Sequence, residues 1–260
     1  MRRFSKYSGC GNDFILIDQS SFMDTDFSNM ARRYCPRRHG IGADGLIVIA
    51  PSCKADFKFS IYNADGSEAE MCGNGLRSAV HYFLKGSGDA LVETKERILR
   101  GKAQQDEVLV EMGDVSEICE KNILIDGNLL SLTTLNTGVP HAVLFVENLD
   151  DFDVFGIGRL IRYHQDFSPH GTNFNACKIT KEGLEVRTYE RGVEDETLAC
   201  GTGATAASIA AALRYNIPAP IKVTVRSRDF LTIDFQIQEN KPKHVTMLGR
   251  CVEVFKGFIP

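Results

Sequence analysis

Two short segments of the chain share one pattern, and this repeat constrains the fold more than any other feature. Residues 69–79 read AEMCGNGLRSA and residues 198–208 read LACGTGATAAS. Cys72 and Cys200, 128 residues apart in a chain of 260, each precede a Gly-x-Gly turn that opens a helical pattern. An offset close to half the length predicts two similar halves, each with one helix whose N-terminus carries a cysteine.

Two further pairings support a duplication. Residues 7–18 (YSGCGNDFILID) align with residues 136–147 (NTGVPHAVLFVE) at an offset of 129. Residues 57–66 (FKFSIYNADG) align with residues 184–193 (LEVRTYERGV) at an offset of 127. Three pairings in the same order at nearly one offset favour duplication over chance.

Short runs rich in β-branched and aromatic residues dominate the chain. They predict strands at 14–18, 46–50, 56–62, 107–112, 141–147, 184–189, 222–226 and 229–238. Helical patterns are few. They predict a helix after Cys72 that ends at Gly86-Ser87-Gly88, a fully buried helix after Cys200, and weaker helices at 27–35 and 154–163. The pattern indicates an α+β protein with two β-rich halves.

Composition excludes several classes of function. The net charge of −4 argues against a nucleic-acid surface, because phosphate binding needs a concentrated basic face. The N-terminus has no apolar run typical of a signal peptide, and no segment is long enough to span a membrane. We therefore expect a cytoplasmic protein with reduced cysteines. Six of them are expected to be structural, most of them buried: Cys10, Cys35, Cys53, Cys119, Cys177 and Cys251.

Cysteines at two helix N-termini suggest acid–base chemistry. The unpaired N–H groups and partial positive charge of a helix start favour a thiolate or a ligand carboxylate. If the two halves face each other, Cys72 and Cys200 can approach one small molecule from opposite sides. One thiolate would remove a proton from the carbon beside a carboxylate, and the opposite thiol would protonate the other face. This arrangement favours inversion of an α-carbon.

With these motifs in place, the chain resembles the diaminopimelate epimerase family over its full length. The resemblance rests on GNDFILID (11–18), GIGADGL (40–46), NADGSEAEMCGNGLR (63–77), NTGVPH (136–141), GTNFN (171–175) and ERGVEDETLACGTGA (190–204). It implies two pseudo-symmetric halves, each a mixed sheet wrapped around a central helix. The first half would span residues 1–117 with a returning C-terminal strand in 249–260, and the second residues 118–248. The active site would lie in the cleft between them.

The same resemblance implies roles for individual residues. Cys72 and Cys200 match the catalytic acid–base pair, and His141 and Glu190 match residues that assist the thiols. The substrate-binding positions are Asn12, Asn63, Gly73, Asn74, Asn173, Glu190, Arg191, Gly201 and Thr202. The reaction would convert LL-diaminopimelate into the meso form, without a cofactor or a metal. We also expect a homodimer that acts on a small amino acid and binds neither nucleic acid nor membrane.

This chain departs from the family pattern at several positions. Val139 stands where many relatives have Asn, and Gly45 where they often have Gln, so two polar contacts with the substrate are lost. The insertion at Glu194-Asp195 lengthens the turn before Cys200. Phe255 stands where relatives place a tyrosine at the dimer contact.

Other interpretations remain open at this point. The departures admit a broader amino-acid racemase, acting for example on glutamate, and a non-catalytic amino-acid binding protein would share the same fold. The segment GIGADG (40–45) matches a dinucleotide fingerprint, but a strand follows it instead of a helix, so we expect a turn. Cys35 and His39 have a metal-like spacing without a second ligand pair, which argues against zinc.

Overall fold

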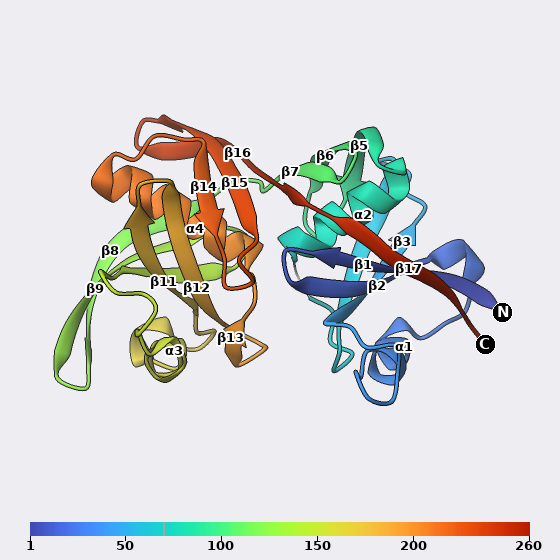
Figure 1. Ribbon diagram of the computed structural model, residues 1–260, viewed down its shortest axis with the longest axis horizontal. Coiled ribbons are helices and arrows are strands. Elements are labelled where there is room, and N and C mark those ends of the chain that lie inside the picture. The colour runs from blue at the N-terminus through green and yellow to red at the C-terminus, as the bar shows by residue number, and fades with distance from the viewer. Residues whose placement is uncertain (70) are drawn as a thin grey trace. The chain divides into compact units, whose positions relative to one another are not determined.

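The structure is a computed structural model that describes residues 1–69 and 71–260. The chain divides into two compact units (Figure 1). The first contains residues 1–111 and 248–260, and the second contains residues 112–247. Each unit has few helices and many strands, so the α+β class predicted from the sequence is confirmed.

The first unit is built from a mixed sheet. β2 pairs with β1 on one side and runs parallel to β3 on the other, β3 and β4 are antiparallel, and β4 runs parallel to β5. β5, β6 and β7 continue as an antiparallel meander, and β17 pairs with β1. The strands are β1 (Arg2–Gly9), β2 (Asn12–Asp18), β3 (Gly45–Ala50), β4 (Phe57–Asn63), β5 (Ser87–Glu93), β6 (Ile98–Gln104), β7 (Glu107–Glu111) and β17 (Val252–Ile259).

The second unit repeats this order of pairings. β9 is antiparallel to β8 and β10, β10 runs parallel to β11, β11 and β12 are antiparallel, β12 runs parallel to β14, and β14 and β15 are antiparallel. The strands are β8 (Ser116–Ile125), β9 (Asn128–Asn136), β10 (Pro140–Phe145), β11 (Asn173–Thr180), β12 (Gly183–Glu190), β13 (Asp195–Thr197), β14 (Ile221–Thr224), β15 (Phe230–Gln238) and β16 (Lys241–Arg250). The short β13 pairs with β12.

Each sheet is packed between a shorter and a longer helix. In the first unit these are α1 (Phe27–Tyr34) and α2 (Gly73–Leu84), and in the second α3 (Val154–Arg162) and α4 (Gly201–Tyr215). Single-turn helices η1 (Gln19–Ser21) and η2 (Gln165–Phe167) complete the secondary structure. Because side chains alternate along a strand, each central strand presents one set of residues to each helix. Leu46 and Val48 of β3 pack with α1, which leaves Ile47 for the side of α2.

The two long helices are the most deeply buried elements. α4 is buried from Gly201 to Ala211 because its Ala-rich sequence lets strands approach on all sides. α2 is buried from Gly73 to Val80, and its last turn is partly exposed. Both helices end at a left-handed residue, Lys85 and Asn216, that terminates the hydrogen-bond ladder.

The predicted helices and strands are present, but several further strands were not predicted. All eight predicted strands and all four predicted helices are found within two residues or so of their expected bounds. The sequence did not indicate β1, β5, β6, β8, β9, β11, β13 or β16; in β6, β8 and β16 the exposed positions are mainly charged or polar. Ser87 and Gly88, expected only to end a helix, begin β5. Among the described residues, no helix is long and apolar enough to cross a membrane.

Candidate active site

Each of the two predicted catalytic cysteines is the N-cap of a central helix. Cys72 precedes α2 in an extended conformation, and its Sγ accepts a hydrogen bond from the N–H of Gly75 at 3.3 Å. Cys200 precedes α4 in the same conformation, and its Sγ accepts from the N–H of Gly203 at 3.4 Å. The partial positive charge of a helix N-terminus stabilises negative charge on a sulfur held there. Both thiols are therefore placed where a thiolate is favoured.

The residues beneath the two cysteine turns differ. In the first unit, Ile47 lies opposite Ile61 across β3 and β4, and a Cβ added to Gly75 would meet the Ile61 Cδ1 atom at 3.1 Å. At the same positions of the second unit, Asn175 lies opposite Thr188. A Cβ added to Gly203 would overlap the Asn175 Oδ1 atom and lie 3.1 Å from the Thr188 hydroxyl. The Cys72 turn therefore rests on apolar side chains, and the Cys200 turn on polar ones.

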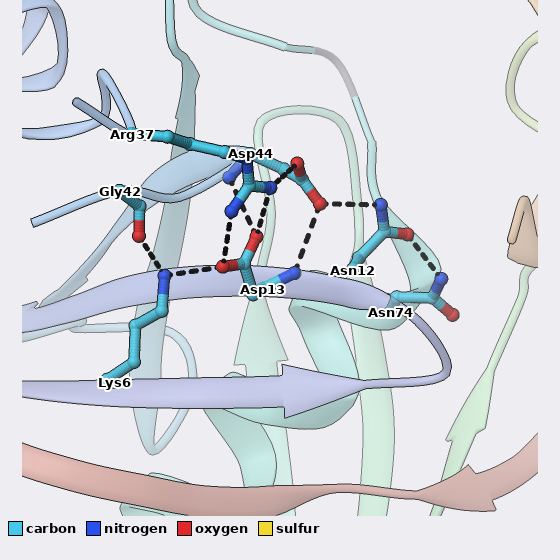
Figure 2. A network of polar contacts seen from close by, with 7 residues as sticks. All are labelled: Lys6, Asn12, Asp13, Arg37, Gly42, Asp44 and Asn74. Atoms are coloured by element: carbon cyan, nitrogen blue, oxygen red, sulfur yellow. Dashed lines mark hydrogen bonds and ion pairs between the residues drawn. The ribbon is translucent and has the colours of Figure 1, made fainter. Parts of the chain in front are cut away.

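In the first unit, the predicted binding residues Asn12 and Asn74 belong to one polar network (Figure 2). The Asn74 amide nitrogen donates to Asn12 Oδ1 at 2.7 Å, and the Asn12 amide nitrogen donates to Asp44 at 3.0 Å. Asn74 Oδ1 in turn accepts from the fully buried guanidinium of Arg77 at 2.7 Å. Each amide is thus fixed in orientation by its neighbours.

Charged residues close this network at its outer end. Arg37 donates to both oxygens of Asp13 at 2.9 and 2.7 Å and to Asp44 at 2.6 Å (Figure 2). Lys6 forms an ion pair with Asp13 at 2.7 Å and donates to the carbonyl of Gly42. Partial burial acts to raise the pKa of Asp13, but Arg37 and Lys6 hold it below its ordinary value. Arg37 thus anchors the loop before β3.

In the second unit, His141 occupies the position that Phe14 occupies in the first, because Phe14 pairs with Gly45 of β3 as His141 pairs with Asn173 of β11. It is the second residue of β10, is 1% exposed, and its Nδ1 lies 3.0 Å from the Asn175 amide nitrogen. Burial, and then the positive charge of Arg191, lower the pKa of His141 to about 3. His141 is therefore neutral over the whole physiological range of pH.

The remaining predicted residues of the second unit surround the turn before α4. Asn173 donates to the carbonyl of Pro140 at 2.9 Å and accepts from the N–H of Arg191 at 2.8 Å, which fixes the start of the loop after β12. The hydroxyl of Thr202 lies 3.4 Å from Cys200 Sγ, and Glu190 ends β12 opposite Asp195 of β13. The structure therefore links Asn173 to the loop of Arg191 and places Thr202 beside Cys200.

Gly73 and Gly201, the other predicted glycines, are the first residues of α2 and α4. Asn63 ends β4 on the surface, where its amide donates to the hydroxyl of Ser67 at 3.0 Å. That bond ties Asn63 to its own loop. Among the described residues, no hydrogen bond joins Asn63 to the Asn12–Asn74 pair.

Sequence reasoning missed four residues that hold the site, namely Asp44, Arg77, Asn175 and Thr188. Arg77 follows a helical pattern that predicts a surface arginine, yet its side chain is fully buried. Asn175 and Thr188 lie inside apolar strands, and a polar residue at a core-facing position of such a strand is a signal that we did not use.

The structure separates the other six cysteines into two groups. Burial raises the pKa of Cys35 and of Cys251 to about 11, and it also raises that of Cys177, as expected for inert structural thiols. Cys53 and Cys119 are exposed, so the general expectation of burial is wrong for these two. No group of side chains suited to bind a metal ion occurs within residues 1–69 and 71–260. Residues 40–44 form the turn expected before β3.

Solved structures of other proteins share this fold. A PhzF-family phenazine biosynthesis protein of Bacillus anthracis matches 98% of this chain and 98% of its own, with a TM-score of 0.75 and 13% identity. A probable proline racemase of Agrobacterium radiobacter K84 matches 100% of this chain and 93% of its own, with a TM-score of 0.76 and 13% identity. At these identities the likeness concerns the fold alone.

The sequence comparisons are more specific. The family model of diaminopimelate epimerase matches residues 4–118 and 133–254. The chain is 39% identical to the diaminopimelate epimerase of Aquifex aeolicus (98% of this chain, 96% of the relative) and 40% identical to that of Archaeoglobus fulgidus (78% and 79%). The chain belongs to the diaminopimelate epimerase family, whose members are isomerases.

Proposed function

We propose that this chain is a cofactor-independent isomerase that interconverts LL-2,6-diaminopimelate and meso-diaminopimelate in the synthesis of lysine and peptidoglycan precursors. Family membership supports the reaction. The observation that carries the mechanism is the repeated cysteine N-cap: Cys72 and Cys200 hold their sulfur atoms at the N-termini of the two most buried helices.

In this mechanism one thiolate removes the α-proton and the other thiol protonates the opposite face of the same carbon. The electron pair of the broken C–H bond remains on the α-carbon and its carboxylate until the second proton arrives. The N–H groups at the starts of α2 and α4 would stabilise that charge. In the reverse direction Cys72 and Cys200 exchange roles. The mechanism requires that both thiols reach one bound molecule.

The other predicted residues would hold the substrate. Arg191 can bind a carboxylate through two parallel hydrogen bonds. Glu190 would assist the thiols. We assign substrate binding to Asn12, Asn63, Gly73, Asn74, Asn173, Glu190, Arg191, Gly201 and Thr202.

The test is proton NMR of LL-diaminopimelate with the reduced protein in deuterated water, followed by chiral separation of the product. We expect the α-proton signal to decay as the meso isomer appears. Cys72→Ser and Cys200→Ser should each reduce the rate by about 10²–10⁴-fold, the typical contribution of one positioned acid or base. Cys53→Ser removes an exposed thiol and is the matched control, which should keep the wild-type rate. Inversion at the wild-type rate after either N-cap substitution would contradict the mechanism.

A broader amino-acid racemase is the second candidate function. Val139 offers no amide to a substrate. A Cβ added to Gly45 would lie 2.8 Å from the carbonyl oxygen of Tyr62, so β3 and β4 leave no space for a larger residue at position 45. Fewer polar contacts reduce discrimination between substrates. Chiral analysis after incubation with glutamate and other amino acids distinguishes this candidate, because a strict epimerase inverts diaminopimelate alone.

We further propose that the protein works in the cytoplasm as a homodimer. β17 exposes a set of large apolar side chains, which supports contact with a second copy of the chain: Val254 (56% exposed), Phe255 (47%) and Phe258 (65%). Sedimentation of the wild type and of Phe258→Lys tests this proposal, since only the variant should sediment as a monomer.

A further inference from the structure

The second unit contains a buried hydrogen-bond donor without an acceptor. His141 is 1% exposed, and its Nε2 atom has no hydrogen-bond partner among the residues that the structure describes. An unsatisfied buried polar group costs about 1–3 kcal/mol. A group of this kind is retained at a functional site when a ligand supplies the missing partner. The state of Nε2, protonated or not, therefore decides what His141 can do.

The orientation of Asn175 is fixed by two neighbours. Its Oδ1 accepts from the hydroxyl of Thr188 at 2.9 Å, and its Nδ2 donates to the carbonyl of Ala142 at 3.3 Å. Rotating the amide by half a turn would bring Asn175 Oδ1 against the carbonyl oxygen of Ala142. Both oxygens are acceptors, so no hydrogen bond could form between them. The amide nitrogen is therefore the atom that faces His141 Nδ1, at 3.0 Å.

The tautomer of His141 follows from this contact. Because Asn175 Nδ2 can only donate, Nδ1 must accept through its lone pair. A neutral imidazole carries one proton, which then lies on Nε2. The imidazolium form would place an N–H at Nδ1 against the N–H of Asn175, so the same amide also disfavours protonation.

We propose that Asn175 is a positioning residue that holds His141 as the neutral Nε2–H tautomer, so that His141 serves the site as a hydrogen-bond donor and not as a base. Thr188 and Ala142 hold Asn175 in turn. Asn175 and Thr188 adjoin the Cys200 turn, since a Cβ added to Gly203 would contact Asn175, Thr188 and the Cys200 sulfur at once. The assignment of a catalytic use to this donor rests on the proposed function, whereas the tautomer does not.

Two consequences concern the chemistry. The positive charge of Arg191 acts on His141, and a donor beside a positive charge favours an anionic acceptor, such as a carboxylate or a thiolate. A neutral imidazole with its proton on Nε2 has no lone pair there, so it cannot take a proton from a thiol at that atom. Glu190 is then the one base, besides the thiolates, among the residues predicted to be catalytic.

Nitrogen-15 NMR of the histidine-labelled protein tests the tautomer directly and needs no substrate. The His141→Gln variant identifies the signals of His141 among those of the six histidines. In the wild type we expect a protonated Nε2 and an unprotonated Nδ1 that do not titrate between about pH 5 and 8. A protonated Nδ1, or titration in that range, would overturn the proposal.

Asn175→Asp is the informative variant, because a carboxylate accepts where the amide donates. We expect the proton to move to Nδ1 and the pKa of His141 to rise toward neutrality, so that the pH profile of kcat/KM gains an ionisation that the wild type lacks. Asn122→Asp adds the same charge at an exposed position of β8 and is the matched control. An unchanged His141 signal in folded Asn175→Asp would also overturn the proposal. A wild-type protein with the expected tautomer but no epimerase activity would refute the proposed function instead.

Discussion

The two units share their backbone topology and differ in the side chains beneath the catalytic turns. Cys72 and Cys200 have the same cap geometry, on helices that cover sheets with the same order of pairings. Where the first unit places Ile47 opposite Ile61, the second places Asn175 opposite Thr188. The duplication has therefore preserved the position of the thiol and changed the environment that supports it.

The polar networks of the two units consequently run in different directions. In the first unit, hydrogen bonds pass from buried Arg77 through Asn74 and Asn12 to the partly exposed Asp44. In the second unit they pass from His141 inward to Asn175 and Thr188. The first network fixes the orientation of the Asn12 and Asn74 amides, whereas the second fixes the protonation state of the buried His141 imidazole. Cysteines at equivalent helix N-termini can thus be supported by different side chains.

The largest expected difference between the units comes from adding one methyl group at equivalent helix positions. Gly75→Ala brings a Cβ to 3.1 Å from the end of the Ile61 side chain, which can move by a few tenths of an ångström. Gly203→Ala overlaps the amide of Asn175, which three hydrogen-bond partners hold in place. We expect Gly203→Ala to lower the free energy of unfolding by about 2–3 kcal/mol, as overpacking a core does. Urea unfolding followed by circular dichroism measures this.

Gly75→Ala is the control for that experiment. Alanine is favoured over glycine inside a helix by up to about 1 kcal/mol, which offsets the cost of moving Ile61. We therefore expect a change in the free energy of unfolding within about 1 kcal/mol of zero. Equal losses in the two variants would mean that the polar support of the Cys200 turn is no more rigid than the apolar support of the Cys72 turn.

An intermediate effect is expected from His141, whose counterpart in the first unit, Phe14, does not titrate. Burial keeps His141 neutral in the folded state, with a pKa of about 3, whereas an unfolded histidine takes up a proton below about pH 6.5. As the pH falls between these values only the unfolded state gains the proton, so the folded state loses up to about 1.4 kcal/mol per pH unit. The free energy of unfolding, measured from pH 7 to 5, should therefore fall more steeply in the wild type than in His141→Gln. Parallel slopes would contradict a buried neutral histidine.

Much of this organisation could be predicted because a duplicated chain repeats its motifs at a nearly constant offset in the sequence. The cysteine turns, the aligned segments at residues 7–18 and 136–147, and the alternating pattern of β4 indicated the core strands and the two central helices. Strands such as β6 and β8 were missed because one face is solvated and charged, which leaves a weak alternation. The roles of Arg77 and Asn175 depend on which atom of a side chain meets which neighbour, and that is a property of packing that no local pattern contains.

The smallest expected effect compares the two loops that lead toward the catalytic turns. Arg32 of α1 holds the first loop through the backbone carbonyl of Asp65 at 2.8 Å, and Arg162 of α3 holds the second through the carboxylate of Glu194 at 3.0 Å. Partial burial acts to raise the pKa of Glu194, but the N–H of Gly192, the Tyr163 side chain and Arg162 hold it below its ordinary value.

A carboxyl group with a lowered pKa stabilises the fold above its unfolded pKa, near 4.3, and this contribution is lost as the pH falls through the folded value. Glu194→Gln should cost about 0.5–1 kcal/mol at neutral pH, the range of a partly exposed ion pair, and nothing measurable well below pH 4. Arg32→Gln removes a bond to a carbonyl that no acid protonates, so its cost of about 1 kcal/mol should persist at low pH. Urea unfolding of both variants at neutral and acidic pH measures the contrast. A cost of Glu194→Gln that survives acidification would show that the carboxylate charge is not what holds the second loop, and the two loops would then be held in the same way.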